Sequence, residues 1–404
     1  MRVLVVTATP PWPPTHGAAL RNSLFLEILA AEHQVDVICL DQTDGLGTSV
    51  PDSICHFVRV RAAVPSVIRR LRMGFSQGLP DVIARHSSWT LRGRVQMLLT
   101  RDRYDVVHLA QIQLAPLIHD VHTMVTRDVD RTRVIYDAHN VEWLLQAALA
   151  DVSTGLRSLW ARRQARLIRR VEEWVARTVD LSVGSSKNDC AGLVNLGAKS
   201  PAYIPHPVRV PSRCPGIDGR NANPTVLFAA NFGYRPNILA AEWFFGRVWP
   251  EIIRNLPRVE LRVVGPGSKA LGPIVPARTT LGGIVGDIEG EYRRSWIVVS
   301  PTSVAAGAPY KVLSAFAAGR PVVARTEGYV GLAPAEQSGV AIASHPDDFA
   351  RVTTEMLHDA SAYNSAAASG FSYLQAVHNT DTVGSQLLEA YARIIEPGSN
   401  KRRI

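Results

Sequence analysis

Short apolar runs rich in valine and isoleucine alternate with amphipathic stretches along most of the chain. The runs that fit buried strands in the first half are 3–9, 34–40, 55–60, 104–110, 133–139 and 181–186. Apolar residues with helical spacing follow the first run at 20–33. β-Branched runs of this kind are typical of strands buried on both faces. Strands that alternate with helices predict a parallel, doubly wound sheet.

The same alternation restarts after a stretch rich in Pro, Gly and Asn at 204–224. The strand-like runs there are 225–230, 259–265, 279–285, 296–302 and 321–324, with a helix expected around 237–254. A chain of 404 residues also exceeds the size, about 250–300 residues, at which a single core stops growing. We therefore expect an α/β protein with two Rossmann-like, doubly wound domains that face each other across a cleft.

The expected domain boundaries follow from the same pattern. The N-terminal domain is expected at 1–205, a linker at 206–224, and the C-terminal domain at 225–380. The remaining residues, 381–404, contain an amphipathic stretch and a tail. We expect this C-terminal helix to cross back to the N-terminal domain.

A long helical stretch from Leu144 to Asp180, broken near 151–155, carries many arginines between apolar residues. One interpretation is a core-packed helix with a solvated basic face. The other is a surface, at 157–177, for anionic lipid or for an anionic acceptor. The second interpretation predicts a peripheral membrane contact.

Composition and charge narrow the class of protein. With 46% hydrophobic and 20% charged residues, the composition is that of a globular protein. The net charge of +9 favours anionic partners. The positive charge is spread over both halves of the chain, without the clustered basic patch that is typical of a nucleic-acid-binding protein. The four cysteines have no paired spacing, and the first apolar run is too short for a secretory signal. These features predict a cytoplasmic protein. We also expect no bound metal, because His119 and His122 lack a third ligand.

The most informative loop and helix are spelled "GAPYKVLSAFAAGRPVV" at 307–323. A strand at 296–302 and a loop of small residues precede the helix, and Pro309 suits its first turn. Free backbone N–H groups at a helix N-terminus form an anion site. A lysine in the first turn opposes the helix dipole, so Lys311 favours a phosphate partner; a plain tight turn with an exposed lysine is the alternative.

Other loops after strands carry candidate chemistry as well. His139, Asn140 and Glu142 follow the strand at 133–139, where a histidine near a carboxylate can be tuned around neutral pH. The loop after the first strand contains Gly17 and leads to Arg21. Neither a G-x-G-x-x-G turn after the first strand nor a G-x-x-x-x-G-K-[ST] motif is present, which argues against dinucleotide and ATP sites.

These segments, taken in order, resemble the family 4 glycosyltransferases of the GT-B fold. The resemblance covers nearly the whole chain and is most specific at 225–333, through "FAANFGYRPNILAAEWFFGRVWPEI", "LRVVGPG", "GGIVGDIEGEYRRSWIVVSPT" and the helix quoted above. It implies a retaining, metal-independent enzyme that moves a sugar from a nucleoside-diphosphate sugar to a hydroxyl group, without a further cofactor. The acceptor would be a natural product, a glycan or a lipid-linked molecule.

The resemblance also implies roles for individual residues on the donor side. Lys311 and Arg235 would stabilise the departing diphosphate, and His139 would contact the donor sugar. The remaining expected donor-binding residues are Gly286, Asp287, Gly307, Ala308 and Ser314.

On the acceptor side the resemblance points to Gly17, Arg21, Asn140 and Glu142. The chain departs from the family where two glutamates are usual, because it has Ala306 and Ser314 there. A lost charge-assisted bond to the ribose would weaken donor binding by about 1.5–3 kcal/mol. Ala306 and Ser314 therefore motivate one alternative, a non-catalytic GT-B homologue serving as an accessory or binding subunit. A nucleotide-sugar epimerase of GT-B architecture is another alternative, which the missing glutamates do not favour.

Overall fold

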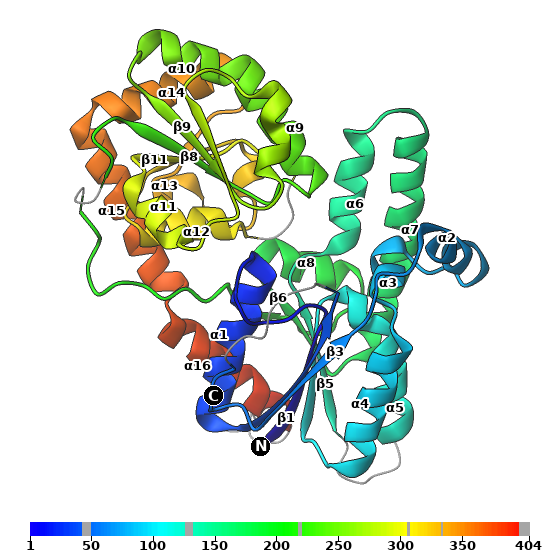
Figure 1. The fold of residues 1–404 in the computed structure, drawn as a ribbon. Coiled ribbons are helices and arrows are strands. Elements are labelled where there is room, and N and C mark those ends of the chain that lie inside the picture. The colour runs from blue at the N-terminus through cyan, green and yellow to red at the C-terminus, as the bar shows by residue number, and fades with distance from the viewer. Residues whose placement is uncertain (43–49, 126–131, 217–219, 305–307, 333, 396–404) are drawn as a thin grey trace. The chain divides into compact units, whose positions relative to one another are not determined.

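The computed structural model describes residues 1–42, 50–125, 132–216, 220–304, 308–332 and 334–395 (Figure 1). The chain divides into two compact units. Unit 1 comprises Met1–Pro207 and Asp381–Ile404, and unit 2 comprises Val208–Thr380. Each unit is built on one parallel sheet with helices on both faces, which confirms the predicted α/β class.

Unit 1 contains a seven-stranded sheet in the order β3-β2-β1-β4-β5-β6-β7. Its strands are β1 Arg2–Thr7, β2 Gln34–Asp41, β3 His56–Arg61, β4 Val106–Ala110, β5 Arg133–Ala138, β6 Leu181–Gly184 and β7 Ala202–Tyr203. Its helices are α1 Gly17–Glu32, α2 Val67–Ser76, α3 Asp81–His86, α4 Trp89–Arg101, η1 Ile112–Leu114, α5 Ala115–Val125, α6 Glu142–Asp151, α7 Gly155–Thr178, α8 Lys187–Asn195 and α16 Thr380–Ile395. Every strand pair in this sheet is parallel. The chain adds strands outward from β1 to β3 on one side and from β4 to β7 on the other, so the direction of strand order reverses between β1 and β4.

Alternation along β1 explains the two layers of helices. Val3 and Val5 belong to one buried cluster, whereas Leu4 and Val6 belong to the cluster on the opposite face. The first cluster is completed by α1 and by α16, whose Leu387 packs there fully buried. The C-terminal helix is therefore part of the core of unit 1.

Unit 2 contains a six-stranded sheet in the order β10-β9-β8-β11-β12-β13. Its strands are β8 Thr225–Ala229, β9 Glu260–Val264, β10 Thr279–Gly283, β11 Ile297–Ser300, β12 Val322–Ala324 and β13 Ala341–Ile342. Its helices are α9 Arg235–Trp243, η2 Phe244–Val248, α10 Trp249–Asn255, η3 Ser268–Ile274, α11 Ile288–Arg294, α12 Tyr310–Ala317, η4 Glu327–Tyr329, α13 Ala335–Ser338, α14 Pro346–His358 and α15 Ala360–Val377. One face of this sheet packs against α9, α10 and α14, and the other against α12 and α15.

The segment expected as a linker at 206–224 is bonded mostly to unit 2. The backbone N–H of Val208 donates to the carbonyl of His378, and that of Asn221 donates to the carbonyl of Arg294. The guanidinium of Arg320 donates to the carbonyl of Gly216. These bonds fix the ends of the segment to the second sheet and its helices.

Two local features differ from, or sharpen, the sequence-based expectation. Pro309 is the N-cap of α12 and not a residue of its first turn, because the helix begins at Tyr310. The long arginine-rich stretch consists of two helices, α6 and α7, which break at 152–154 as expected.

Candidate functional site

The carboxyl ends of β8 and β11 lie next to each other where the strand order of unit 2 reverses. In open α/β sheets this is the position at which ligands bind. Arg235 begins the helix that follows β8, and Lys311 is the second residue of the helix that follows β11. The fold thus places both predicted phosphate-binding residues after neighbouring strands.

Lys311 is held at the N-terminus of α12 without an acidic partner in the described part of the chain. Its Nζ donates to Thr302 Oγ1 at 3.2 Å and lies 6.0 Å from the centre of the Phe228 ring. Burial lowers the pKa of Lys311 to about 8. A cation that is both desolvated and opposed by the helix dipole is unfavourable alone and would be stabilised by an anion.

Ser314 lies one turn further along α12 and already has a partner within unit 2. Its hydroxyl interacts with the phenol of Tyr292 on α11 and acts to lower the pKa of that phenol, although burial raises this pKa overall. Tyr292 is 4% exposed, so the pair ties α11 to α12. This contact is one that the sequence alone did not indicate.

The other predicted donor residues are placed as follows. Ala306 and Gly307 lie outside the described residues, and Ala308 is buried. Asp287 is the N-cap of α11, where its carboxylate accepts from the N–H of Gly290 at 2.7 Å. At Gly286 a side chain would meet no atom within 4 Å, so packing does not require glycine there. Asp287 therefore has a structural role in the described chain, because its carboxylate caps α11 through the N–H of Gly290.

Arg235 lies in an exposed position at the start of α9. Its guanidinium is 3.8 Å from Glu242 on the same helix. An exposed pair at this distance is weak, so it leaves the guanidinium free to reorient toward an anion.

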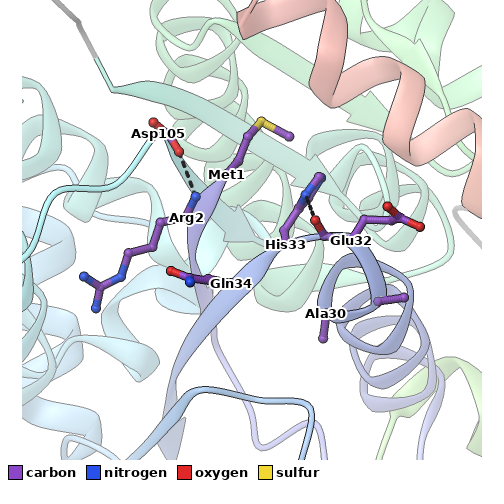
Figure 2. A pocket seen from close by; sticks show the side chains of 8 residues that line it. Met1, Arg2, Ala30, Glu32, His33, Gln34 and Asp105 are labelled. Carbon is purple, nitrogen blue, oxygen red and sulfur yellow. Dashed lines mark hydrogen bonds between the residues drawn. The ribbon is translucent and has the colours of Figure 1, made fainter.

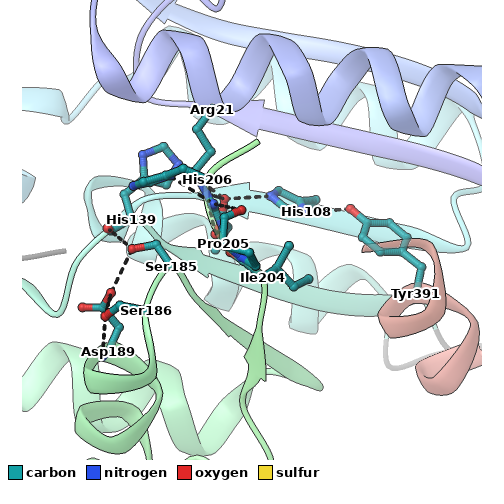
Figure 3. A network of polar contacts seen from close by, with 11 residues as sticks. Arg21, His108, His139, Ser185, Ser186, Asp189, Ile204, Pro205, His206 and Tyr391 are labelled. Carbon is teal, nitrogen blue, oxygen red and sulfur yellow. Dashed lines mark hydrogen bonds and ion pairs between the residues drawn. The ribbon is translucent and has the colours of Figure 1, made fainter. Parts of the chain in front are cut away.

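In unit 1, the carboxyl end of β5 carries a network of buried polar groups (Figure 3). Asp137 is fully buried and accepts from Arg21 at 2.8 Å and 3.0 Å. His139 Nε2 is 3.4 Å and His108 Nε2 is 3.8 Å from the same carboxylate. His108 in turn bonds the hydroxyl of Tyr391 on α16 at 2.7 Å through Nδ1.

The charges of this network set the protonation of His139. Burial alone would raise the pKa of Asp137, but Arg21 and the neighbouring histidines hold it well below its usual value. The pKa of His139 is lowered, chiefly by burial, which outweighs the attraction of Asp137. His139 is therefore neutral at neutral pH and suited to hydrogen bonding.

Arg21 corrects the expectation of an acceptor contact. Its side chain has no exposed surface, and its donors are directed to Asp137, to the carbonyls of Ile204 and Pro205, and to His206 Nδ1. It therefore stabilises the interior of unit 1 and does not reach the surface. Gly17 is the first residue of α1 and lies near the surface.

Asn140 and Glu142 lie at the N-terminus of α6, where the carboxyl group of Glu172 on α7 accepts hydrogen bonds. Glu172 accepts from the N–H groups of Glu142 and Trp143 at 2.8 Å and 3.0 Å. Burial raises the pKa of Glu172 to about 8. Burial also raises the pKa of Glu142 to about 7, although hydrogen bonds from Gln146 and Asn140 act to lower it. Glu142 thus titrates close to neutral pH.

Asp137 and Glu172 escaped the analysis of the sequence, although a signal for each exists. Asp137 is a carboxylate inside an apolar strand, "RVIYDAH". Glu172 occupies the face of α7 that Ile168 and Val175 bury. A charged residue at a position that periodicity assigns to the core is expected to be paired there.

Two hollows in unit 1 have different relations to the sheet. An open one of about 600 Å³ lies at the amino end of β1, around Met1, Arg2, His33 and Asp105 (Figure 2). It is on the edge opposite to the one that binds ligands in such folds. A second, of about 520 Å³, is lined by residues of α2, α4, η1 and α5, among them Arg69, Arg72 and Trp89.

Two searches of the described residues bear on metals and membranes. Among them no group of three or more His, Cys, Asp or Glu side chains is arranged to hold a metal ion. No helix within the described ranges combines the length and apolar character needed to cross a bilayer.

Comparison with known proteins bears on the fold and on unit 2. Residues 223–359 match the family model described as "Glycosyl transferases group 1". Among solved structures, a sucrose-phosphate synthase from Thermosynechococcus elongatus superposes with a TM-score of 0.76 at 15% identity, over 98% of this chain and 100% of that one. WaaG, a glycosyltransferase involved in lipopolysaccharide biosynthesis, superposes with a TM-score of 0.63 at 15% identity, over 98% and 100%. The fold is that of the GT-B glycosyltransferases.

Two further relatives cover nearly the whole chain. HepE from Anabaena, solved in complex with UDP and glucose, has a TM-score of 0.64 at 13% identity, over 97% of this chain and 99% of that one. A Klebsiella pneumoniae protein described as an "Uncharacterized 44.6 kDa protein in cps region" is 21% identical over 402 residues, covering 96% of this chain and 99% of its own length. The structural likenesses show the GT-B fold, and the match of residues 223–359 to a glycosyltransferase family model supports the coarser prediction of a glycosyltransferase.

Proposed function

We propose that this GT-B chain is a glycosyltransferase of family 4 that uses a nucleoside-diphosphate sugar as donor. The observation that carries the proposal is Lys311, which is desolvated at the N-terminus of α12, at the edge of the sheet where ligands bind. The segment that contains it is matched by a glycosyltransferase family model, and a structural neighbour, HepE, was solved with UDP and glucose.

In the proposed reaction the bond between the anomeric carbon and the diphosphate oxygen breaks, and a bond to the acceptor oxygen forms. Negative charge grows on the diphosphate as it departs. Preorganised N–H groups of α12, Lys311 and Arg235 would stabilise that charge without a metal ion. We further propose that configuration is retained, with the acceptor proton passing to the departing diphosphate, and that neutral His139 hydrogen-bonds the transferred sugar.

The acceptor side is proposed in coarser terms. Glu142, near the carboxyl end of β5 with a pKa of about 7, is a candidate to accept a hydrogen bond from an acceptor hydroxyl. A natural product, a glycan and a lipid-linked molecule each offer such a hydroxyl. The basic stretch 157–177 would give the protein a peripheral membrane contact if the acceptor is lipid-linked.

Donor binding is the direct test of the proposal. Calorimetric titration with UDP, GDP, dTDP and their common sugars should give one clear ligand for the full chain. Lys311→Ala should lower its affinity at least tenfold, because a charge-assisted contact to phosphate is lost. Arg258→Ala is the matched control, since Arg258 is an exposed arginine of the same unit at the amino end of β9. If none of these nucleotides or nucleotide sugars binds, the proposal is refuted.

A non-catalytic GT-B homologue is the second candidate, and Ser314 is the reason to keep it. Ser314 interacts with Tyr292, and it stands where the glycosyltransferase family that the chain resembles usually has a glutamate. Turnover separates the two candidates. Release of nucleoside diphosphate from the donor that binds would exclude the non-catalytic role, whereas tight binding without hydrolysis or transfer would favour it.

A further inference from the structure

Helix α2 turns its apolar side toward solvent. Val67, Ile68, Leu71 and Phe75 have the spacing of one helix face, yet all are exposed, Ile68 at 81% and Phe75 at 72%. The only buried residue of the helix is Gly74. An amphipathic helix of a globular protein normally directs such a stripe at the core. The apolar side of α2 instead faces outward, as in a helix that binds a membrane or another molecule.

Polar contacts hold α2 in this orientation. Arg70 forms an ion pair with Asp81 at 2.7 Å. Arg163 of α7 donates to the carbonyl of Gly74 at 2.6 Å. These bonds anchor the helix to α3 and α7 without covering its apolar stripe.

The beginning of α7 extends the same surface. The guanidinium of Arg163 lies 4.5 Å from the ring of Phe75 and 5.6 Å from the ring of Trp160, so it bridges the two aromatic side chains. Leu156, one turn earlier, is 84% exposed. We call Val67, Ile68, Leu71, Phe75, Leu156 and Trp160 the α2 surface. Exposed apolar residues gathered in this way mark an interaction site.

The charge around the α2 surface is mostly positive, and Asp81 of α3 is already paired with Arg70 and Arg85. Neither 61–80 nor 152–171 contains an acidic residue, and both contain several arginines. Within the described part of the chain, the side chains of Arg69 and Arg72 form no ion pair, so they are available to anions. Two such surfaces facing each other would repel, which argues against a second copy of the chain as the partner.

We infer that the α2 surface docks onto a bilayer that contains anionic lipids. An interfacial helix buries apolar and aromatic side chains among the lipids, while neighbouring arginines bind the lipid phosphates. The α2 surface has both kinds of residue. The sequence predicted a membrane contact along 157–177, but in the middle of that helix Arg169 pairs with Glu173. We place the membrane contact instead on α2 and the beginning of α7. The inference concerns binding to lipid alone and does not require that the proposed glycosyl transfer be correct.

Co-sedimentation of the full chain with vesicles tests it, without donor or acceptor present. The chain should bind vesicles of phosphatidylcholine mixed with phosphatidylglycerol, and should bind pure phosphatidylcholine much less. Ile68→Glu and Phe75→Glu should each weaken binding by about tenfold or more, because each removes an apolar side chain from the interface. Ile284→Glu is the matched control, since Ile284 is 76% exposed in unit 2 and gains the same charge; it should bind like the wild type.

Replacement of both arginines and a change of salt complete the test. Arg69→Gln combined with Arg72→Gln should lower binding to the anionic vesicles by roughly 20-fold, and raised salt should do the same to the wild type. Equal loss of binding in the Ile284→Glu control, or unchanged binding in Ile68→Glu and Phe75→Glu, would overturn the inference. A dimer in solution that Ile68→Glu dissociates would also overturn it, because a second copy would then be the partner.

Discussion

The buried pair of Arg21 and Asp137 should dominate the stability of unit 1. Replacing Arg21 with methionine keeps a long apolar side chain but leaves the Asp137 carboxylate in a fully buried site. The arginine also donates to the carbonyls of Ile204 and Pro205, which would lose those bonds. The change therefore removes a counter-charge and leaves buried acceptors unsatisfied.

The magnitude follows from the geometry of the pair. Breaking a buried ion pair by removal of one partner typically costs about 3–5 kcal/mol, and the bidentate contact at 2.8 Å and 3.0 Å places this pair in that range. His108 and His139 face the same carboxylate at 3.8 Å and 3.4 Å. Loss of Arg21 also removes one of the charges that lower the pKa of His139. In the variant His139 therefore takes up a proton more readily and replaces part of the lost charge, so the cost should be smaller at pH 6 than at pH 8.

A double-mutant cycle is the assay. Arg21→Met, Asp137→Leu and the double variant are compared by urea denaturation, with hydrogen exchange of peptides from α1 and β5 to report on unit 1 itself. The double variant should be less destabilised than the sum of the single variants by at least 2 kcal/mol, since removing both charges leaves neither one buried alone. Additive effects, or an Arg21→Met variant as stable as the wild type at pH 8, would refute the reasoning.

Three further predictions concern other groups. Because the pKa of Lys311 is about 8, donor affinity measured by calorimetry should fall about tenfold between pH 7 and pH 9 as the ammonium loses its proton, and this fall should vanish in Lys311→Ala. Ser314→Glu should tighten donor binding by tenfold or more if the serine is a weakened ribose contact; no gain in a titration would count against that role. The pKa of Glu172 is raised by burial from 4.5 to about 8, so its contribution to stability is fully present below pH 4.5 and is lost as the pH rises through 8. Glu172→Gln should therefore remove about 3–5 kcal/mol of the decline in stability over that range, seen as a flatter curve of Tm against pH; an unchanged curve would contradict it.

The sequence predicted every strand of the described structure except the two-residue strands β7 and β13, because burial on both faces leaves a continuous apolar run that periodicity detects. It gave ranges for only some of the helices, among them those that became α1, α6, α7, α12 and α16. It also predicted that Lys311 would lie at the start of a helix after a strand, through the proline and small residues before it. It misjudged Arg21, since an arginine one turn into a helix looks exposed unless its carboxylate partner is known. That partner, Asp137, is 116 residues away in the chain.

The local pattern of the sequence was enough to predict the α/β class and the alternation of strands and helices, and it also predicted an anion site before α12. These depend on short-range spacing, β-branched content and the chemistry of helix ends, all of which are written in consecutive residues. The tertiary structure was needed to show which polar groups meet across the chain, such as Arg21 with Asp137 and Glu172 with the N-terminus of α6. It also decided that the apolar stripe of α2 faces outward, because the same periodicity fits a helix buried in a core and one laid against another surface. The physical reason is that pairing and burial depend on which distant segments come together, and spacing along a helix or strand does not specify that.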